Sequence, residues 1–160
     1  MVKVWNADSG QEAHQTRASY TSVTCLEYNS NGNLLAAGDM NSEITILEAR
    51  DTLRTRRKLQ GHTDRVNNCK FTSAERNQLI SVSSDRTLKV WAVGTGKVCK
   101  SFAFSSAPHA IDVSTNDNYF ASGHKNGELR VWSLTDPKEV QKLKVHTDQI
   151  TSLKFSRDGS

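Results

Sequence analysis

The tetrad LKVW at residues 88–91 is the key to this 160-residue sequence, because it returns as LRVW at residues 129–132. Two earlier segments occupy the same position in the repeat: VKVW, which ends at Trp5, and ITIL, which ends at Leu47. The spacings between the last residues of the four segments are 42, 44 and 41. Self-similarity at a fixed period of this size indicates a repeat architecture.

A second marker recurs in step with the first. VTCLEY at 23–28, VNNCKF at 66–71 and ITSLKF at 150–155 share one apolar spacing, and HAIDV at 109–113 is a weaker copy. Between the markers, short runs alternate apolar and polar residues and end at turn residues, as strands do. No segment has a helical apolar stripe, so the sequence predicts an all-β fold. A period of about 40–45 residues with tryptophan at a fixed position is typical of four-stranded β-propeller blades.

The sequence resembles the WD-repeat family, and one unit carries most of the resemblance. GHTDRV at 61–66, SVSSDRT at 81–87 and LKVW at 88–91 together match that repeat almost completely. The resemblance implies a structural hydrogen-bond network through His62, Ser81, Asp85 and Trp91. Such a network would supply partners to a buried carboxylate and a buried indole N–H, which burial otherwise penalises.

The neighbouring units keep only part of this set. Asn126 stands where the complete unit has Asp85, the unit ending at Trp132 has no Gly-His pair before its first strand, and Leu47 replaces the tryptophan. Asn41, like Asp85 and Asn126, stands six residues before the last residue of its unit. Short polar side chains bond the backbone of tight turns, and we expect all three to do so.

The predicted architecture is a partial β-propeller of WD repeats, with about three to four four-stranded blades in an incomplete ring. One propeller segment covers 1–160: the end of a truncated blade at 1–5, blades at 6–48, 49–92 and 93–133, and the start of a truncated blade at 134–160. A ring of about seven blades needs roughly 290 residues at this period. We therefore expect a fragment of a longer propeller, whose open strand edges draw copies of the chain together.

Over nearly its whole length the sequence is similar to the C-terminal WD-repeat region of autophagy-related protein 16-like proteins. The similarity rests on NGNLLAAG, LQGHTDRVNNCKF, SSDRTLKVW followed by GKVCKSF, and HAIDVS leading to ASGHKNGELRVW. It implies a non-enzymatic scaffold for autophagosome assembly, located in the cytoplasm and recruited to the forming autophagosome membrane through partners. Those partners would be proteins or peptide motifs. The conjugation machinery would be reached through the family's N-terminal part, which this sequence lacks.

Composition and motifs argue against several other classes of protein. The formal charge is +4 with a pI near 9.1, and the 17 acidic residues are spread through the chain, so a dedicated nucleic-acid binder is not expected. The three cysteines and five histidines show no metal-ligand spacing, and no phosphate loop or nucleophile elbow is present. No catalytic residue, metal, cofactor or small-molecule substrate is therefore predicted. Cys69 falls in a core position of its strand, whereas Cys25 falls on the opposite face and is the more reactive candidate.

Two alternatives remain from the sequence. The basic run RTRRK at 54–58 allows an RNA-processing or ribosome-assembly factor, although no aromatic residue lies between Arg50 and Arg65 to stack on bases. A substrate receptor of a ubiquitin ligase would also be a binding protein with the same features.

The expected binding surface is the propeller face formed by two sets of loops. These loops precede the first strand of each blade and connect its second and third strands. Tyrosine, methionine and arginine are over-represented in interface cores, so these loops are where we expect a partner to bind. The residues predicted on this partner face are Tyr20, Ser22, Met40, Thr63, Arg65, Ser84, Lys125 and Gln149.

Overall fold

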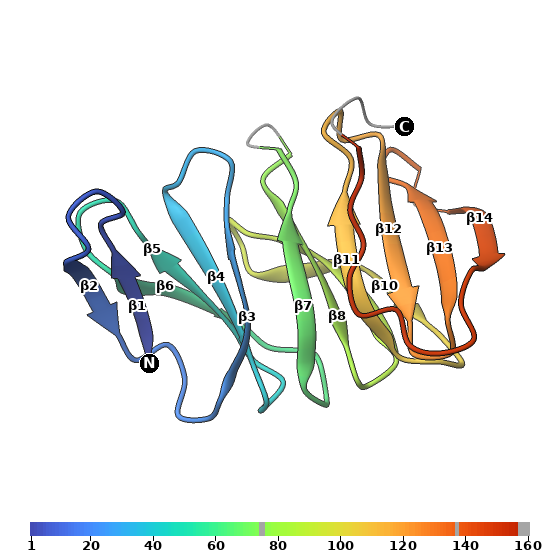
Figure 1. Cartoon of the computed structure of the whole chain (residues 1–160), viewed down its shortest axis with the longest axis horizontal. Coiled ribbons are helices and arrows are strands. Elements are labelled where there is room, and N and C mark those ends of the chain that lie inside the picture. The colour runs from blue at the N-terminus through green and yellow to red at the C-terminus, as the bar shows by residue number, and fades with distance from the viewer. Residues whose placement is uncertain (74–75, 137, 157–160) are drawn as a thin grey trace.

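A computed structural model, which describes residues 1–73, 76–136 and 138–156, contains strands and no helix within those ranges (Figure 1). Three four-stranded sheets and one two-stranded sheet follow one another along the chain. This is the predicted all-β partial propeller, with the ring not closed. The two-stranded sheet pairs β1 (Val2–Trp5) with β2 (Glu12–Thr16).

Each four-stranded sheet is an antiparallel meander in chain order. The first sheet contains β3 (Val23–Tyr28), β4 (Leu34–Asp39), β5 (Ile44–Glu48) and β6 (Arg54–Leu59). The second contains β7 (Val66–Phe71), β8 (Gln78–Ser83), β9 (Thr87–Ala92) and β10 (Lys97–Ala103). The third contains β11 (Pro108–Val113), β12 (Tyr119–His124), β13 (Glu128–Ser133) and β14 (Glu139–Lys144).

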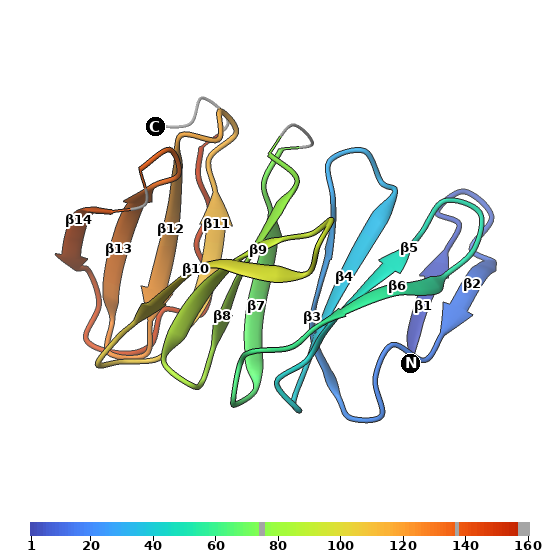
Figure 2. The same ribbon diagram turned by 180° about the vertical axis from the view of Figure 1, so that it is seen from behind.

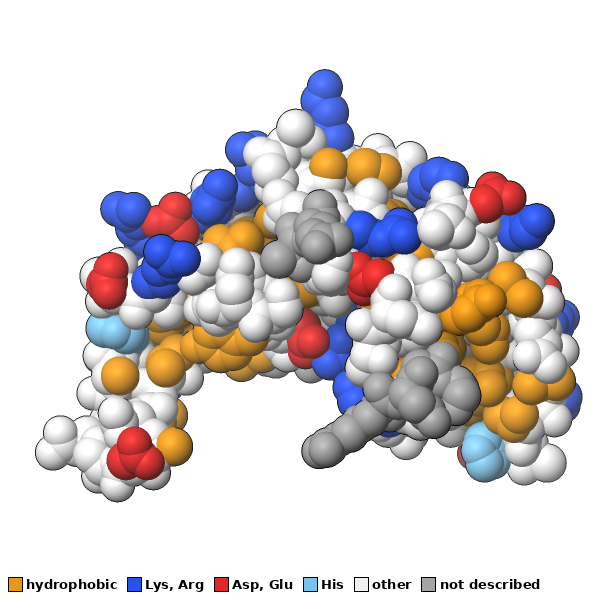
Figure 3. Space-filling view, turned by 90° about the horizontal axis from the view of Figure 1, so that it is seen from above, with side chains coloured by type: hydrophobic (Ala, Val, Ile, Leu, Met, Phe, Trp, Pro, Cys, Tyr) orange, Lys and Arg blue, Asp and Glu red, His pale blue; other side chains and the backbone are white. Residues whose placement is uncertain are grey.

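The sheets stand side by side in an open arc. Strands β3, β7 and β11 line one side (Figure 1), and the view from behind shows β6 and β10 on the other (Figure 2). Seen from above, the arc is hollowed on the inner side, and lysine and arginine side chains gather along its convex outer side (Figure 3). The outer strands β6, β10 and β14 are almost entirely exposed, which explains their polar composition.

Sheets and sequence repeats are out of step by one strand. The predicted unit 6–48 contains β2 to β5, yet β2 pairs with β1, and β6 completes the first sheet. The four-stranded sheets accordingly run over 23–59, 66–103 and 108–144. The units 49–92 and 93–133 begin in the same way, with the outer strand of the preceding sheet. The repeat describes where similar residues recur, whereas pairing follows from the short connection between the third and fourth strands.

The predicted last segment, 134–160, contains one strand and a stretch that is not a strand. Residues 139–144 form β14, while 137 and 157–160 lie outside the described residues. The stretch 150–155, expected as a first strand, is not assigned as one. It runs beside β11, where the Phe155 amide donates a hydrogen bond to Asp112 at 2.8 Å.

The hydrophobic core is divided into layers between neighbouring sheets. Leu79 of β8 joins the layer against the first sheet, whereas the next residue, Ile80, joins the layer against the third. A third layer packs Val2 of the two-stranded sheet against Leu35 and Leu47. Because successive strand residues point to opposite faces, middle strands buried on both faces need nearly continuous apolar runs.

A bulge in each innermost strand links one sheet to the next. The pairing register of β3 skips Thr24, and that of β7 skips Asn67. The Thr24 hydroxyl donates to the Val66 carbonyl at 2.5 Å, and the Asn67 amide donates to the Pro108 carbonyl at 2.9 Å. Bulges re-aim a side chain, and here they aim a donor at the adjacent sheet.

We expect Gly38→Ala to lower the free energy of unfolding by about 1–3 kcal/mol, because no room exists for a methyl group between the first two sheets. A Cβ atom at Gly38 would lie 2.6 Å from the Cys25 sulfur and 2.8 Å from Val66 Cγ1. Urea titration should show the loss, and Gly94→Ala, whose Cβ meets nothing nearer than 3.8 Å, is the matched control. Cys25→Ala in the Gly38→Ala chain should restore part of the loss. Equal midpoints for the two glycine variants would contradict this packing.

Candidate functional site

The second sheet contains a buried chain of hydrogen bonds through four side chains. The Trp91 indole N–H donates to Ser81 Oγ at 2.8 Å, and Ser81 Oγ lies 2.7 Å from His62 Nε2. His62 Nδ1 lies 2.8 Å from Asp85 Oδ2. These are the four residues that the WD-repeat resemblance joined, and they are brought together by β8, β9, the turn between these strands and the loop before β7.

With a neutral His62 ring protonated at Nδ1, every donor along this chain of hydrogen bonds meets an acceptor. Since Trp91 can only donate, the Ser81 hydroxyl proton is free to go to His62 Nε2, and Nδ1–H then donates to Asp85. Burial alone would raise the pKa of Asp85, but hydrogen bonds from His62 and Thr87 outweigh it and hold that pKa well below its usual range. A carboxylate that is ionised at neutral pH therefore anchors the network.

The third sheet builds a similar chain from different residues. Trp132 Nε1 donates to Ser122 Oγ at 3.2 Å, and Ser122 Oγ lies 3.1 Å from His124 Nε2. His124 Nδ1 lies 3.0 Å from the Ser106 carbonyl, which replaces the carboxylate. Phe104 fills the space that His62 occupies one sheet earlier, with its ring 5.7 Å from that of Trp132. Burial lowers the pKa of His124, in keeping with a neutral ring that accepts at one nitrogen.

The first sheet has no such network of side-chain hydrogen bonds around Leu47, and a different residue accepts hydrogen bonds from its turn. Leu47 is fully buried in an apolar layer that also contains Ala37. The prediction that Asn41 holds the turn is wrong: Asp39 Oδ1 accepts hydrogen bonds from the Asn41 and Glu43 amides at 2.9 and 3.0 Å. Asp39 also accepts from the Ser19 hydroxyl at 2.6 Å. In the first sheet the last residue of β4, Asp39, takes the acceptor role that Asp85 and Asn126 have in the other two sheets.

The predicted partner face lies along the lower edge of Figure 1. All eight residues are in the loops before β3, β7 and residue 150, or in the turns after β4, β8 and β12. Tyr20 is 89% exposed and Met40 is 52% exposed, so both large side chains are available for contact with a partner. The other exposed members are Ser22, Thr63, Arg65 and Lys125, whereas Ser84 and Gln149 are half-buried.

Arg17 and His109 lie next to residues of the predicted partner face, and one predicted residue, Ser84, makes an internal contact. The Arg17 guanidinium lies 5.5 Å above the Tyr20 ring, and burial together with the nearby Arg65 charge lowers the pKa of His109. Neither residue was predicted, because Arg17 precedes the repeat marker and His109 sits at the bulge of β11. Ser84 is engaged internally, since its hydroxyl donates to Asn67 at 3.0 Å.

The basic run at 54–58 makes contacts within the fold. Arg54 lies 2.6 Å from Glu48, and Lys58 lies 2.8 Å from Glu43. Arg57 donates to the Gly94 and Thr95 carbonyls of the second sheet at 3.1 and 3.0 Å. These side chains are therefore partly committed to holding β6 in place.

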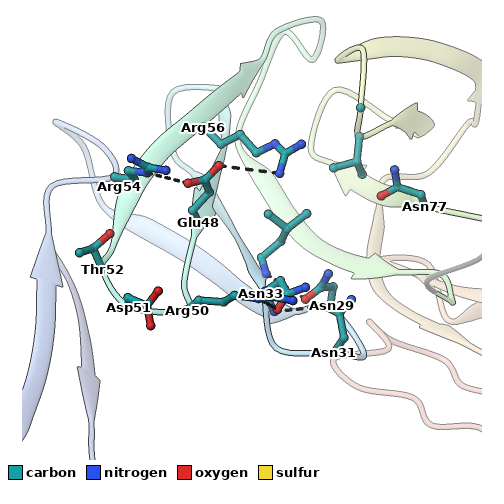
Figure 4. Close-up of a pocket in the computed structure, with 13 residues that line it drawn as sticks. Asn29, Asn31, Asn33, Glu48, Arg50, Asp51, Thr52, Arg54, Arg56 and Asn77 are labelled. Carbon is teal, nitrogen blue, oxygen red and sulfur yellow. Dashed lines mark hydrogen bonds and ion pairs between the residues drawn. The ribbon is translucent and has the colours of Figure 1, made fainter.

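A pocket of about 460 Å³ lies at the opposite end of the strands from the partner face, where the first two sheets meet (Figure 4). Three arginines line it, but Arg54 and Arg56 flank Glu48, and Arg50 donates to Asn33. With Asp51 also in the lining, three positive charges face two negative ones. This near balance, and the lack of an aromatic side chain in the lining, give little basis for nucleic-acid binding.

Within the described ranges, no group of three or more His, Cys, Asp or Glu side chains is arranged to hold a metal ion. Nor does any helix in that part of the chain have the length and apolar character to cross a membrane. Cys69 is buried, as predicted for a core residue, Cys25 is half-buried and Cys99 is exposed.

The sequence matches the profile of the WD domain, G-beta repeat, at residues 10–46, 53–92, 96–133 and 137–160. Autophagy-related protein 16 of Arabidopsis thaliana is 26% identical over 159 residues, which are 99% of this chain and 31% of the relative. Guanine nucleotide-binding protein subunit beta of Zea mays is 30% identical, over 98% of this chain and 45% of the relative. Protein tipD of Dictyostelium discoideum is 29% identical, over 95% of this chain and 25% of the relative. The chain thus spans less than half of these relatives.

Two solved structures of computationally designed proteins have a similar backbone. Ika8 has a TM-score of 0.83 at 27% identity, covering 96% of this chain and 46% of the designed one. Ika4 has a TM-score of 0.80 at 26% identity, and the match covers 94% of this chain and 95% of the designed one. Both likenesses extend over nearly all of the sheets described above.

Proposed function

Because this chain belongs to the WD40 repeat family, we propose that it is the protein-binding part of an autophagy adaptor of the protein 16 type, acting in autophagosome assembly. It is a WD-repeat protein with the features of a scaffold. In the proposed role it works in the cytoplasm, binds peptide motifs on other proteins, and reaches the forming autophagosome membrane only through those partners.

The observation that carries the binding role is the exposed side-chain set on the partner face. Tyr20, Met40 and Arg65 project from loops whose backbone is fixed by hydrogen bonds, such as Met40 N to Ser22 O at 3.0 Å. Rigid loops that present aromatic and arginine side chains lower the entropic cost of binding. The similarity to autophagy-related protein 16 over 99% of this chain supports the finer assignment.

We expect Tyr20→Ala and Arg65→Ala each to weaken binding to a peptide partner by more than about 1 kcal/mol, roughly fivefold, because few residues carry most of the affinity of an interface. Both side chains are exposed, so the unfolding midpoint should stay unchanged. Isothermal titration of the partner recovered with the wild-type chain gives the affinity. Arg54→Ala, on the outer strand β6, is the matched control. Normal binding by both partner-face variants, with loss in the control, would place recognition on the outer edge.

The autophagy role is tested separately from the binding face. Deletion of the gene should reduce the number of autophagosomes formed on starvation, and the wild-type gene should restore it. Restoration by Arg54→Ala but not by the Tyr20→Ala, Arg65→Ala double variant would connect the face to the process. A normal number of autophagosomes after deletion would refute the autophagy assignment and leave the scaffold role intact.

A subunit of a guanine nucleotide-binding complex is the second candidate. It is favoured by the 30% identity to the Zea mays beta subunit over 98% of this chain. Co-purification of a GTP-binding protein with the tagged chain, lost in the partner-face double variant, would select this candidate over the autophagy adaptor.

A further inference from the structure

Two thiols from neighbouring sheets face one another across the boundary between the first and second sheets. Cys25 lies on β3 and Cys69 on β7, and their sulfur atoms are 3.5 Å apart. Cys69 is 1% exposed, whereas Cys25 is half-buried and is therefore the more accessible residue of the pair. The residues are 44 positions apart in the sequence and one repeat apart in the fold, so only the packing of the two sheets brings them together.

Contacts on both sides of the thiols hold the two strands in register. On one side, the Thr24 hydroxyl donates to the Val66 carbonyl at 2.5 Å. On the other side, Lys70 Nζ lies 2.7 Å from Glu27 Oε2. Cys25 directly follows Thr24 in β3, and Cys69 directly precedes Lys70 in β7. The fold therefore holds the two thiols face to face, and a disulfide requires the sulfurs to move from 3.5 Å to about 2.0 Å apart.

The surroundings distinguish the two sulfurs. Gly38 stands opposite Cys25 and, having no side chain, leaves the space that the Cys25 sulfur occupies. The hydrogen bond with Cys69 lowers the pKa of Cys25, although burial opposes it. The same hydrogen bond, together with complete burial, raises the pKa of Cys69. Because the thiolate is the nucleophilic form, these opposite shifts make Cys25 the more nucleophilic thiol of the pair, and it is also the less buried one.

We propose that Cys25 and Cys69 are a redox modification site, which closes to a reversible disulfide between the first two sheets when the chain meets hydrogen peroxide. The Cys25 sulfur attacks one peroxide oxygen, an S–O bond forms, and the O–O bond breaks. The departing oxygen takes up a proton and leaves as water. The Cys69 sulfur then attacks the Cys25 sulfenic acid, the S–S bond forms, the S–O bond breaks, and a second water leaves with the Cys69 proton. Two thiols lose two electrons, and one peroxide gains them.

Reduction reverses the reaction. One small thiol, such as glutathione, attacks the disulfide and gives a mixed disulfide, and a second thiol releases the cysteine. In a reducing compartment the bond would therefore form only transiently, as redox-sensing disulfides do. While closed, it fixes β3 against β7.

The test uses the full chain with Cys99→Ser, which removes the exposed third thiol. Treatment with hydrogen peroxide should lower the number of alkylatable thiols from two to zero in one kinetic phase. Mass spectrometry should find a loss of two hydrogens and one peptide cross-linked between Cys25 and Cys69, and glutathione should restore both thiols. The thermal midpoint of the oxidised chain should rise by about 5–10 °C, as a typical disulfide gives in a chain of this size.

Single variants test which sulfur reacts first. In Cys69→Ser, Cys25 should stop at the sulfenic acid and be captured by dimedone. In Cys25→Ser, Cys69 should stay unmodified at the same dose because it is buried. The cross-link should also be lost when the wild-type chain is oxidised in urea. If the native chain shows no Cys25–Cys69 peptide at a peroxide dose that oxidises Cys99, or if cross-links join different copies of the chain, the proposal is overturned. If a single variant fails to fold, the search for the Cys25–Cys69 peptide in the chain that keeps both cysteines still shows whether the disulfide forms.

Discussion

Trp91→Ala should lower the free energy of unfolding by about 3–5 kcal/mol, because it empties the largest fully buried side-chain position in the chain. Trp91 packs in the layer between the first and second sheets, and its ring meets the edge of His62 at 5.9 Å between centroids. The variant also leaves Ser81 Oγ without the indole donor, which adds the cost of an unsatisfied buried group. Urea titration followed by far-ultraviolet circular dichroism gives the midpoint without relying on tryptophan fluorescence.

Trp5 is the matched control for this prediction. It is the same residue type at the same position in the repeat, yet it is 56% exposed, so Trp5→Ala should change the free energy by no more than about 0.5 kcal/mol. Trp91→Phe separates two contributions, since it keeps most of the buried ring and removes only the N–H donor. Equal losses for Trp5→Ala and Trp91→Ala would mean that burial does not distinguish the two positions.

The sequence was sufficient for features that depend on residues at fixed repeat positions. Strand locations and the all-β class follow from alternation and the repeat period, and the bonded set His62, Ser81, Asp85 and Trp91 was named from the family resemblance. In the third sheet, by contrast, the imidazole comes from His124 within β12, and Phe104 occupies the vacated space. A search for the same residue at the same position misses such a replacement. The sequence feature that could have indicated this replacement is His124, two residues before Asn126.

Features that depend on contact between sheets could not be predicted from the sequence. The placement of β6 with β3 to β5, and of β2 with β1, is decided by pairing and not by the repeat. The bulges at Thr24 and Asn67 aim donors at carbonyls 42 and 41 residues away. Nothing local to either residue specifies its distant partner. The same holds for Cys25 and Cys69, whose opposite strand faces suggested separation until the sheets were placed side by side.

Asp85→Ala should destabilise the chain by about 1–3 kcal/mol, whereas Asn126→Ala should cost about 0.5–1 kcal/mol. The two residues occupy the same repeat position, so the difference comes from the side chain, a carboxylate or an amide, and from its hydrogen-bond partners. Asp85 accepts four hydrogen bonds, at 2.8 and 3.0 Å from His62 Nδ1 and the Thr63 amide, and at 2.8 and 2.7 Å from the Thr87 amide and hydroxyl. Asn126 Oδ1 accepts from the Glu128 amide at 3.2 Å. Equal urea midpoints for the two variants would contradict the assigned network.

The pH dependence of stability provides an independent test of the Asp85 carboxylate. Its pKa in the folded chain is held below the value of about 3.9 expected for an unfolded chain, because the hydrogen bonds outweigh burial. A group with a depressed folded pKa contributes fully above the unfolded pKa, and that contribution is lost as the pH falls toward the folded pKa. The stability gap between the wild-type chain and Asp85→Asn should therefore be constant from pH 7 to about 5 and narrow below about pH 4. Other carboxylates titrate in the same range, but they are common to both chains and cancel in the difference. A gap that stayed constant down to pH 3 would show that the ionised state of Asp85 does not hold His62 and the turn in place.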